Sequence, residues 1–277
     1  MAFGNELDFY RQQTEITDPG DLAGWYADIP DDVAELIRLI QNVAMHRDGA
    51  LWRFGVMLSD QRYAEGETRE VREILALLGG FAERPPEDRF GATCRDFCVL
   101  LVSMLRHRGV PARVRGGFGN YNWIFGAPRL FDDHWVVEYW TAEHGWRLAD
   151  AQVGGSAMHD YRIDFDPVDV PRDRFVVAGQ AWLDCCAGTR DPETFIVSGL
   201  RRRGLPVIGP TVVRDLAALN GIECFPWDEW GIMKVPYERL SADELALLEN
   251  AAKISAIGGP LEDVRRLRSA HPALRAE

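Results

Sequence analysis

The chain has 277 residues, of which 47% are hydrophobic and 27% charged, and its formal net charge at pH 7 is −12. This length and composition are typical of a globular protein with one large domain or two smaller ones. Proteins that bind phosphate backbones or anionic membranes usually do so through basic surfaces. The acidic balance therefore argues against nucleic acid and membranes as partners.

The N-terminal residues 1–16 (MAFGNELDFYRQQTEI) lack the basic and apolar segments of a secretory signal. No apolar run approaches the roughly 18 residues that a membrane-spanning helix needs. The five cysteines are odd in number and do not suggest a disulfide framework. A cytoplasmic protein with reduced thiols is therefore expected.

The first part of the chain is predicted to be helical. In residues 31–45 apolar side chains recur at helical spacing behind acidic residues that suit a helix N-terminus. A second helix is expected over 67–78, where Gly79 and Gly80 end it. Residues 82–92 (AERPPEDRFGA) combine proline with charge and cannot continue a helix, so a boundary is expected there.

A helix and four strands are predicted after this break. The helix covers about 94–108, and the runs typical of strands follow at 112–118, 134–140, 145–150 and 174–177. A helix followed by strands without intervening helices predicts an α+β layer arrangement and not a doubly wound parallel sheet.

Helices are expected again beyond residue 180, at 212–220, 241–255 and 260–268. Ser241 and Glu244 have the spacing of a capping box. The prediction thus has three parts, and the third could pack with the second as one domain. They are a helical N-terminal region (1–85), a central core of helix and strands (86–180) and a mainly helical C-terminal region (181–277).

Cys94 is predicted to be the first residue of its helix. Thr93 can act as the N-cap, and Asp96 three positions later completes an acidic variant of the capping box. The N–H groups and the dipole at a helix N-terminus favour thiolate over thiol, and they lower the pKa of a cysteine from about 8.5. The same N–H groups can hold an oxyanion. Cys98, one turn later on the apolar face, is expected to pack in the core.

A nucleophilic cysteine needs a base, and six histidines are available. His107 lies at the opposite end of the same helix, about 20 Å away at 1.5 Å per residue. His134 begins a strand and Asp150 ends the next one. A hairpin whose turn is centred on Ala142 would pair these two residues directly, so that the carboxylate could orient the imidazole.

The register of this hairpin is open at the sequence level. A tighter turn, centred on His144 and Gly145, would move Asp150 by about four positions, or roughly 13 Å along the strand. His144 and His159 are the alternative bases, and both lie in turn-like contexts.

Four motifs resemble those of the transglutaminase-like superfamily of papain-type cysteine enzymes. They lie within about 60 of the 277 residues, and they are GATCRDF (91–97), HRGVPARVRGGF (107–118), DHWVVE (133–138) and GWRLAD (145–150). The resemblance implies a papain/transglutaminase-like catalytic core over 86–180, in which the helix that bears Cys94 packs on an antiparallel sheet. In this core Cys94 is the nucleophile, His134 the general base and Asp150 the orienting acid.

Two positions depart from the family's pattern. Trp135 follows His134 directly, whereas the family usually has a small residue there and a tryptophan one place later, where this chain has Val136. This difference concerns the shape of the substrate cleft. In addition, Cys98 occupies a position that the family commonly fills with alanine.

The loop between Phe118 and Asp133 is the expected cleft segment. It contains glycine and proline, and its aromatic side chains can either line a cleft or pin the loop to the core. The candidate cleft residues are Trp123 and Phe125 in this loop and Trp135 after the base.

The mechanism that the resemblance implies proceeds through an acyl-enzyme. The Cys94 thiolate attacks an amide or thioester carbonyl, His134 donates a proton to the leaving group, and water or an amine completes hydrolysis or transfer. By analogy, Gln61 and Trp52 are candidates for a second oxyanion donor besides the Cys94 N–H. The predicted function is that of a peptidase, amidase or acyltransferase acting on a small-molecule, peptide or protein acyl substrate.

Two other functions remain as alternatives. One is a transglutaminase-like binding protein without catalysis, and the other is a metal-dependent hydrolase that uses Asp132, Asp133 and His134. No cofactor or metal is expected for the cysteine mechanism. The sequence GGFG at 116–119 lacks the second half of a dinucleotide-binding fingerprint, and the adjacent Cys185 and Cys186 lack the spacing of a zinc-binding pair.

Overall fold

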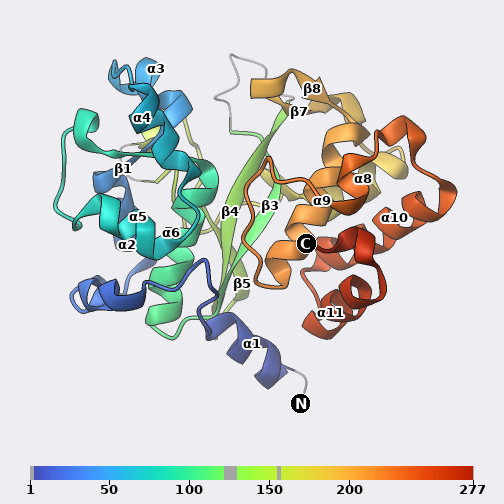
Figure 1. The fold of residues 1–277 in the computed structure, drawn as a ribbon, viewed down its shortest axis with the longest axis horizontal. Helices are drawn as coiled ribbons and strands as arrows, with labels where there is room; N and C mark the ends of the chain where they lie inside the picture. Colours follow the sequence, from blue (N-terminus) through green and yellow to red (C-terminus); the bar gives the residue numbers. More distant parts are fainter. Residues whose placement is uncertain (1–2, 122–129, 155–156, 277) are drawn as a thin grey trace. The chain divides into compact units, whose positions relative to one another are not determined.

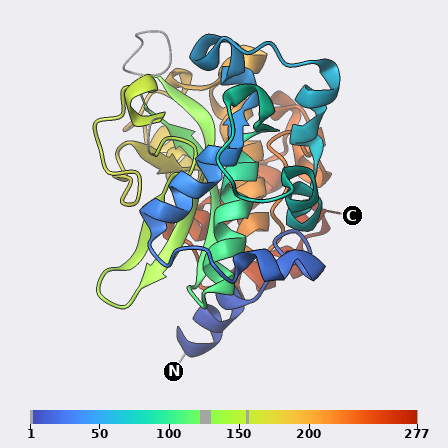
Figure 2. The ribbon, with the colours of Figure 1, turned by 90° about the vertical axis from the view of Figure 1, so that its left-hand side faces the viewer.

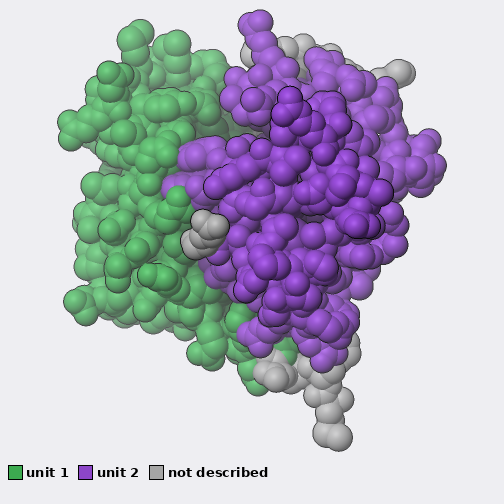
Figure 3. Space-filling model, turned by 45° about the vertical axis from the view of Figure 1, so that its right-hand side comes forward, with its two compact units in different colours: residues 1–113, 136–170 green, residues 114–135, 171–277 purple. Residues whose placement is uncertain are grey.

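The structure is a computed structural model, and it describes residues 3–121, 130–154 and 157–276. The chain folds into two compact units that are discontinuous in sequence (Figure 3). Unit 1 contains residues 1–113 and 136–170, and unit 2 contains residues 114–135 and 171–277. The contiguous three-part division at residues 85 and 180 stays a prediction.

Unit 1 is built around the buried helix α6 (Cys94–His107), whose residues 95–106 are all buried. Helices α1, α2 and α5 pack against it, and Figure 2 shows this face of the unit. The elements of unit 1 besides α6 are α1 (Phe3–Arg11), α2 (Val33–Val43), β1 (Ala44–His46), α3 (Ala50–Phe54), α4 (Asp60–Tyr63), α5 (Val71–Leu78), β2 (Phe90–Ala92), the second part of β4 (Phe131–Thr141), β5 (Gly145–Ala149) and α7 (Ala157–Asp160).

Strand pairing in unit 1 is of two kinds. Strands β1 and β2 pair in parallel, with Met45 opposite Gly91. The second part of β4 pairs antiparallel with β5, from Val137 opposite Ala149 to Thr141 opposite Gly145.

Unit 2 combines a sheet with three helices that pack against one another, α8, α9 and α10 (Figure 1). The strand order in this sheet is β6-β3-β4-β7-β8, and β4 and β7 run parallel. Its elements are most of β3 (Ala112–Gly119), the first part of β4, β6 (Phe175–Val177), α8 (Ala178–Cys186), β7 (Phe195–Val197), β8 (Arg202–Arg203), α9 (Leu205–Leu219), α10 (Ala242–Ile257) and α11 (Leu261–Ala270).

The fold is α+β, as predicted. The sheet is mixed and not purely antiparallel, because the pairing of β4 with β7 is parallel whereas β3–β6, β4–β5 and β7–β8 are antiparallel. Among the described residues, no helix combines the length and apolar composition that crossing a bilayer requires.

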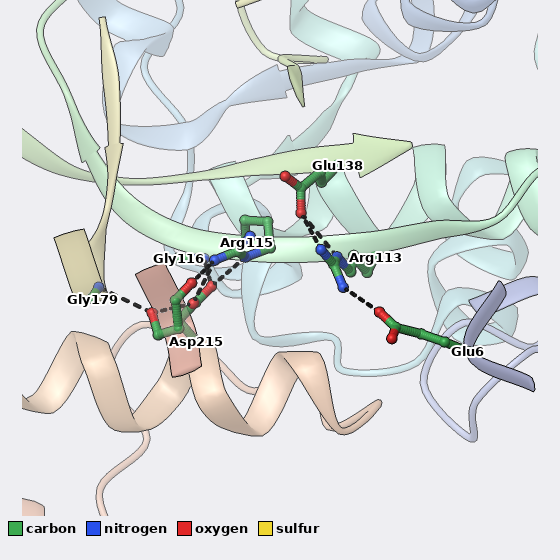
Figure 4. Close-up of polar contacts among 8 residues, drawn as sticks. Glu6, Arg113, Arg115, Gly116, Glu138, Gly179 and Asp215 are labelled. Atoms are coloured by element: carbon green, nitrogen blue, oxygen red, sulfur yellow. Dashed lines mark hydrogen bonds and ion pairs between the residues drawn. The ribbon is translucent and has the colours of Figure 1, made fainter. Parts of the chain in front are cut away.

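Two buried arginines of β3 are each held by carboxylates of their own unit (Figure 4). In unit 1 the Arg113 Nε–H donates to Glu138 at 2.9 Å, and Glu6 accepts a longer hydrogen bond of 3.5 Å. The Arg113 guanidinium also lies 4.1 Å from the centre of the Trp146 ring. This cluster ties α1 to β3, β4 and β5.

In unit 2 the Arg115 guanidinium donates to both carboxylate oxygens of Asp215, each at 3.0 Å. The same carboxylate accepts the backbone N–H of Gly116 at 2.8 Å and the hydroxyl of Ser255 at 2.6 Å. Ser255 Oγ in turn accepts the N–H of Gly179 at 3.0 Å. One buried carboxylate on α9 therefore joins β3, α8 and α10.

Gly179 marks the place where α8 meets α10. An added Cβ would lie 2.6 Å from Ser255 Oγ and against the backbone carbonyl of Ala252. We expect Gly179→Ala to lower the free energy of unfolding by about 1–3 kcal/mol, because the helices must move apart to admit the methyl group. Urea unfolding measures this. In Gly199→Ala, where an added Cβ meets nothing within 4 Å, the change should stay within about 0.5 kcal/mol.

Candidate active site

Helix α6 begins at Cys94, as predicted, and its N-terminus is capped from within. The Asp96 carboxylate accepts the backbone N–H of Thr93 at 2.8 Å and the Thr93 hydroxyl at 2.9 Å. Both Thr93 and Asp96 are buried. The cap fixes the backbone on either side of Cys94.

The strand before α6 is also firmly held. The N–H of Gly91 in β2 donates to Glu65 at 3.0 Å, and an added Cβ at Gly91 would lie 2.6 Å from the carbonyl oxygen of Arg62. Glycine is therefore required for α4 to approach β2. With β1 paired to it as well, β2 delivers the chain to Cys94 in a fixed position.

The two cysteines of α6 have different environments. Cys94 is partly exposed, whereas Cys98 is 1% exposed, which confirms that Cys98 packs in the core. Burial raises the pKa of Cys98 well above its usual value, and the negative charges of Cys94, Asp150 and Asp96 raise it further. Cys98 is therefore a neutral thiol within electrostatic reach of Cys94 and Asp150, all in unit 1.

Asp150 follows β5 and is 1% exposed. Its carboxylate accepts the N–H of Gln152 at 2.9 Å, and its own N–H donates to the Pro167 carbonyl at 2.8 Å. These contacts hold the predicted orienting acid in place.

The predicted direct pairing of His134 with Asp150 is wrong by two positions. Thr141 pairs with Gly145, so the turn is centred on Glu143 and not on Ala142. Extending this register by one step beyond Val137 and Ala149 places Asp150 opposite Val136. The alternative turn, centred on His144 and Gly145, is wrong as well.

His134 lies on the first part of β4, in unit 2, and is 2% exposed. Its imidazole meets the rings of Tyr121 and Phe175 edge-on, with centroids 5.3 and 6.3 Å away. Aromatic packing thus limits how the ring can turn. Because Cys94 and Asp150 belong to unit 1, the triad of the three residues stays a prediction.

Asp132 and Asp133 are the two carboxylates of the metal-dependent alternative. Asp132 accepts the Ser198 N–H at 2.9 Å and the Ser198 hydroxyl at 2.6 Å. Burial raises the pKa of Asp133 to about 6, and Arg214 opposes this effect. Within the described ranges, no group of three or more His, Cys, Asp or Glu side chains is arranged to hold a metal ion.

The two candidate oxyanion donors are exposed, whereas the candidate cleft residue Trp135 is buried. Gln61 is exposed, and Trp52 is 57% exposed with its ring edge-on to Tyr161. Trp135 is 1% exposed, and an added Cβ at Gly116 would lie 3.4 Å from its ring. Its side chain therefore fills the interior instead of lining an open surface.

Four further residues were candidates for the cleft or for the base. Trp123 and Phe125 lie outside the described residues. His107 is at the far end of α6, as predicted, and its ring packs edge-on against Tyr26. The side chain of His144 is 53% exposed beside Glu143 in the hairpin turn.

Residues 83–151 match the family model of the transglutaminase-like superfamily. The matched segment contains Cys94, His134 and Asp150. This segment is therefore similar to the transglutaminase-like superfamily. The segment falls almost entirely within the catalytic core predicted at 86–180, and it includes β2, α6, β3, β4 and β5.

A search of curated proteins found no match. A crystal structure of a candidate cysteine protease from Cytophaga hutchinsonii aligns with 62% of this chain and 45% of its own, at 16% identity and a TM-score of 0.35. The chain thus spans less than half of that protein's length.

Sequence reasoning missed two features around the candidate site residues. Arg95, next to the predicted nucleophile, is 0% exposed, although a charged residue in a first helical turn usually faces solvent. The ring of Phe175 lies against His134 although the two are distant in sequence. The sequence signal for the burial of Arg95 was an arginine followed by an aspartate at the start of an otherwise apolar helix.

Proposed function

We propose that the protein is a cysteine enzyme that acts on amide or thioester carbonyls through an acyl-enzyme. Cys94 is the nucleophile, His134 the general base and acid, and Asp150 the group that orients His134. The observation that carries this proposal is the position of Cys94: a partly exposed thiol at the first residue of a capped, buried helix.

The proposed chemistry follows from that position. The first N–H groups of a helix have no partner within the helix, so they can stabilise both a thiolate and the oxyanion that forms when sulfur attacks a carbonyl. The S–C bond forms, the bond from carbon to the leaving group breaks, and the His134 imidazolium gives its proton to the leaving group. Water attack on the thioester then gives hydrolysis, and amine attack gives transfer.

The other two members of the proposed triad are supported by burial and by the family match. Asp150 is held by the N–H of Gln152 and by the Pro167 carbonyl, and it lies within electrostatic reach of Cys98 on α6. His134 is enclosed by aromatic rings, which limits its rotation. Buried side chains with fixed rotamers are what a catalytic triad needs. Gln61 and Trp52 remain proposed second oxyanion donors.

Alkylation with iodoacetamide at pH 7 tests the proposal. We expect Cys94 to react first, because burial raises the pKa of Cys185 to about 12 and also raises that of the exposed Cys186. Those thiols stay protonated and react slowly. Peptide mass spectrometry locates the label. We expect His134→Ala to slow the Cys94 reaction at least about 10-fold, since in the proposed triad the imidazolium stabilises the thiolate.

The matched control is Cys186→Ser, which removes the most exposed cysteine. It should leave the fast reaction intact, and Cys94→Ser should eliminate it. Equal labelling of Cys94 and Cys186, or a fast reaction that survives Cys94→Ser, would contradict the proposal and favour a binding protein with this fold.

A further inference from the structure

We propose that Arg95 and Asp96 form a buried ion pair that controls how readily the neighbouring Cys94 thiol ionises. They are positioning residues, since each acts on the reaction only through Cys94. The inference rests on the proposed role of Cys94 as nucleophile, but its test does not require turnover.

The pair is completely enclosed. The side chains of Arg95 and Asp96 are both 0% exposed, and an Arg95 guanidinium N–H donates to the Asp96 carboxylate at 3.3 Å. The other oxygen of that carboxylate holds the N–H and the hydroxyl of Thr93. Asp96 therefore serves the helix cap and the ion pair at once.

The charges around this end of α6 are unequal. Besides burial, Cys94, Asp150 and Asp96 raise the pKa of Cys98 when they are ionised, and Arg95 lowers it, so all four groups lie within electrostatic reach of this thiol. Inside a protein such charges are only weakly screened. Burial raises the pKa of Asp96, and the Arg95 guanidinium opposes this effect. An ionised Cys94 adds a negative charge to the same end of α6, where Arg95 is a cation that can stabilise it.

The charged groups on the elements around α6 are paired with one another or exposed to solvent, unlike the enclosed Arg95 and Asp96. His46 on β1 pairs with Ala92, and Glu65, which accepts the Gly91 N–H, is itself paired with Arg62. Helix α1 contacts the opposite end of α6. Gln13, two residues after the end of α1, donates a side-chain N–H to the Ser103 carbonyl of α6. The charged residues of α2 and α5 are exposed, where solvent and salt screen them; they are Glu35, Arg38, Arg72 and Glu73.

Two substitutions with opposite expected effects test the proposal. Arg95→Met removes the cation, and we expect the midpoint of the pH profile of Cys94 alkylation to rise by about one unit or more, which slows the reaction at pH 7 about 10-fold. Asp96→Asn removes a negative charge but keeps the shape, so the midpoint should fall. Arg95→Lys keeps the charge and should restore most of the wild-type profile.

The direction of the shift separates this role from a structural one. Both substitutions disturb a buried pair, so both should lower the melting temperature, but only a charge effect moves the two midpoints in opposite directions. Midpoints that stay fixed, or that move the same way, would overturn the proposal. Should Arg95→Met fail to fold, Asp96→Asn decides alone: a lower midpoint supports the proposal, and an equal or higher one contradicts it.

The outcome is also distinct from that of the proposed function. If His134→Ala leaves Cys94 alkylation unchanged while the opposite shifts persist, the triad is wrong and the role of the ion pair stands. If His134→Ala slows alkylation and the shifts are absent, the triad stands and the ion pair is only structural.

Discussion

Cys94→Ala is expected to reduce acylation by p-nitrophenyl acetate about 1,000-fold or more. The thiolate is the only group in the proposed mechanism that forms a covalent bond with the acyl carbon, so neither the oxyanion site nor His134 can replace it. The wild-type protein should release a burst of p-nitrophenolate and gain one acetyl group. Stopped-flow absorbance measures the burst, and intact-protein mass spectrometry measures the adduct.

Cys98→Ala is the matched control for this experiment. It changes a cysteine of the same helix to the residue that the family commonly has at that position, and its side chain is 1% exposed. Most of the burst should remain. An undiminished burst in Cys94→Ala would rule out Cys94 as the nucleophile, and a wild-type protein with no burst or adduct would favour the binding alternative.

Helices α6 and α10 could be predicted because local signals specify them, whereas α9 (Leu205–Leu219) begins seven residues before the predicted 212–220, in a stretch that contains Pro206 and Pro210. Helix α6 has a cap at Thr93 and Asp96, and α10 has a capping box at Ser241 and Glu244. By contrast, β1, β2, β7 and β8 have two or three residues each, too few to show alternation. Their pairing, including the parallel contact of β4 with β7, depends on long-range packing that no local pattern records.

The hairpin that bears part of the candidate site shows where register prediction fails. Residues 142–144 form a three-residue turn, Thr141 Oγ1 accepts the N–H of His144, and Gly145 has a positive φ of 70°. Such a turn commonly ends with a glycine in the left-handed region. The sequence TAEHG is also compatible with turns centred on Ala142 or on His144 and Gly145. Each of these turns would pair Asp150 with a different residue of β4.

The buried arginines of β3 also escape local reasoning. Residues 112–118 predict a strand, but they do not reveal that Arg113 and Arg115 are each 1% exposed. Charged side chains are seldom buried without partners, and here the partners are far away in sequence, Glu138 for Arg113 and Asp215 for Arg115. Only the folded chain brings them together.

Asp215→Asn is expected to lower the free energy of unfolding by about 3–5 kcal/mol, the largest stability effect that we predict. The substitution keeps the shape of the side chain but leaves the Arg115 guanidinium without its bidentate anion in a fully buried place. It also weakens the acceptor for Gly116 and Ser255. Urea unfolding followed by tryptophan fluorescence gives the value, provided that the slope with denaturant is unchanged.

Two variants show whether the effect comes from an uncompensated charge. Glu249→Ala breaks an exposed ion pair with Lys253 in the same unit and should cost less than about 1 kcal/mol. The double substitution Arg115→Met with Asp215→Leu removes both charges and should recover part of the loss, since a buried pair can often be replaced by apolar groups. A loss below 1 kcal/mol in Asp215→Asn, or a double variant less stable than Asp215→Asn, would show that the charge is not what matters there.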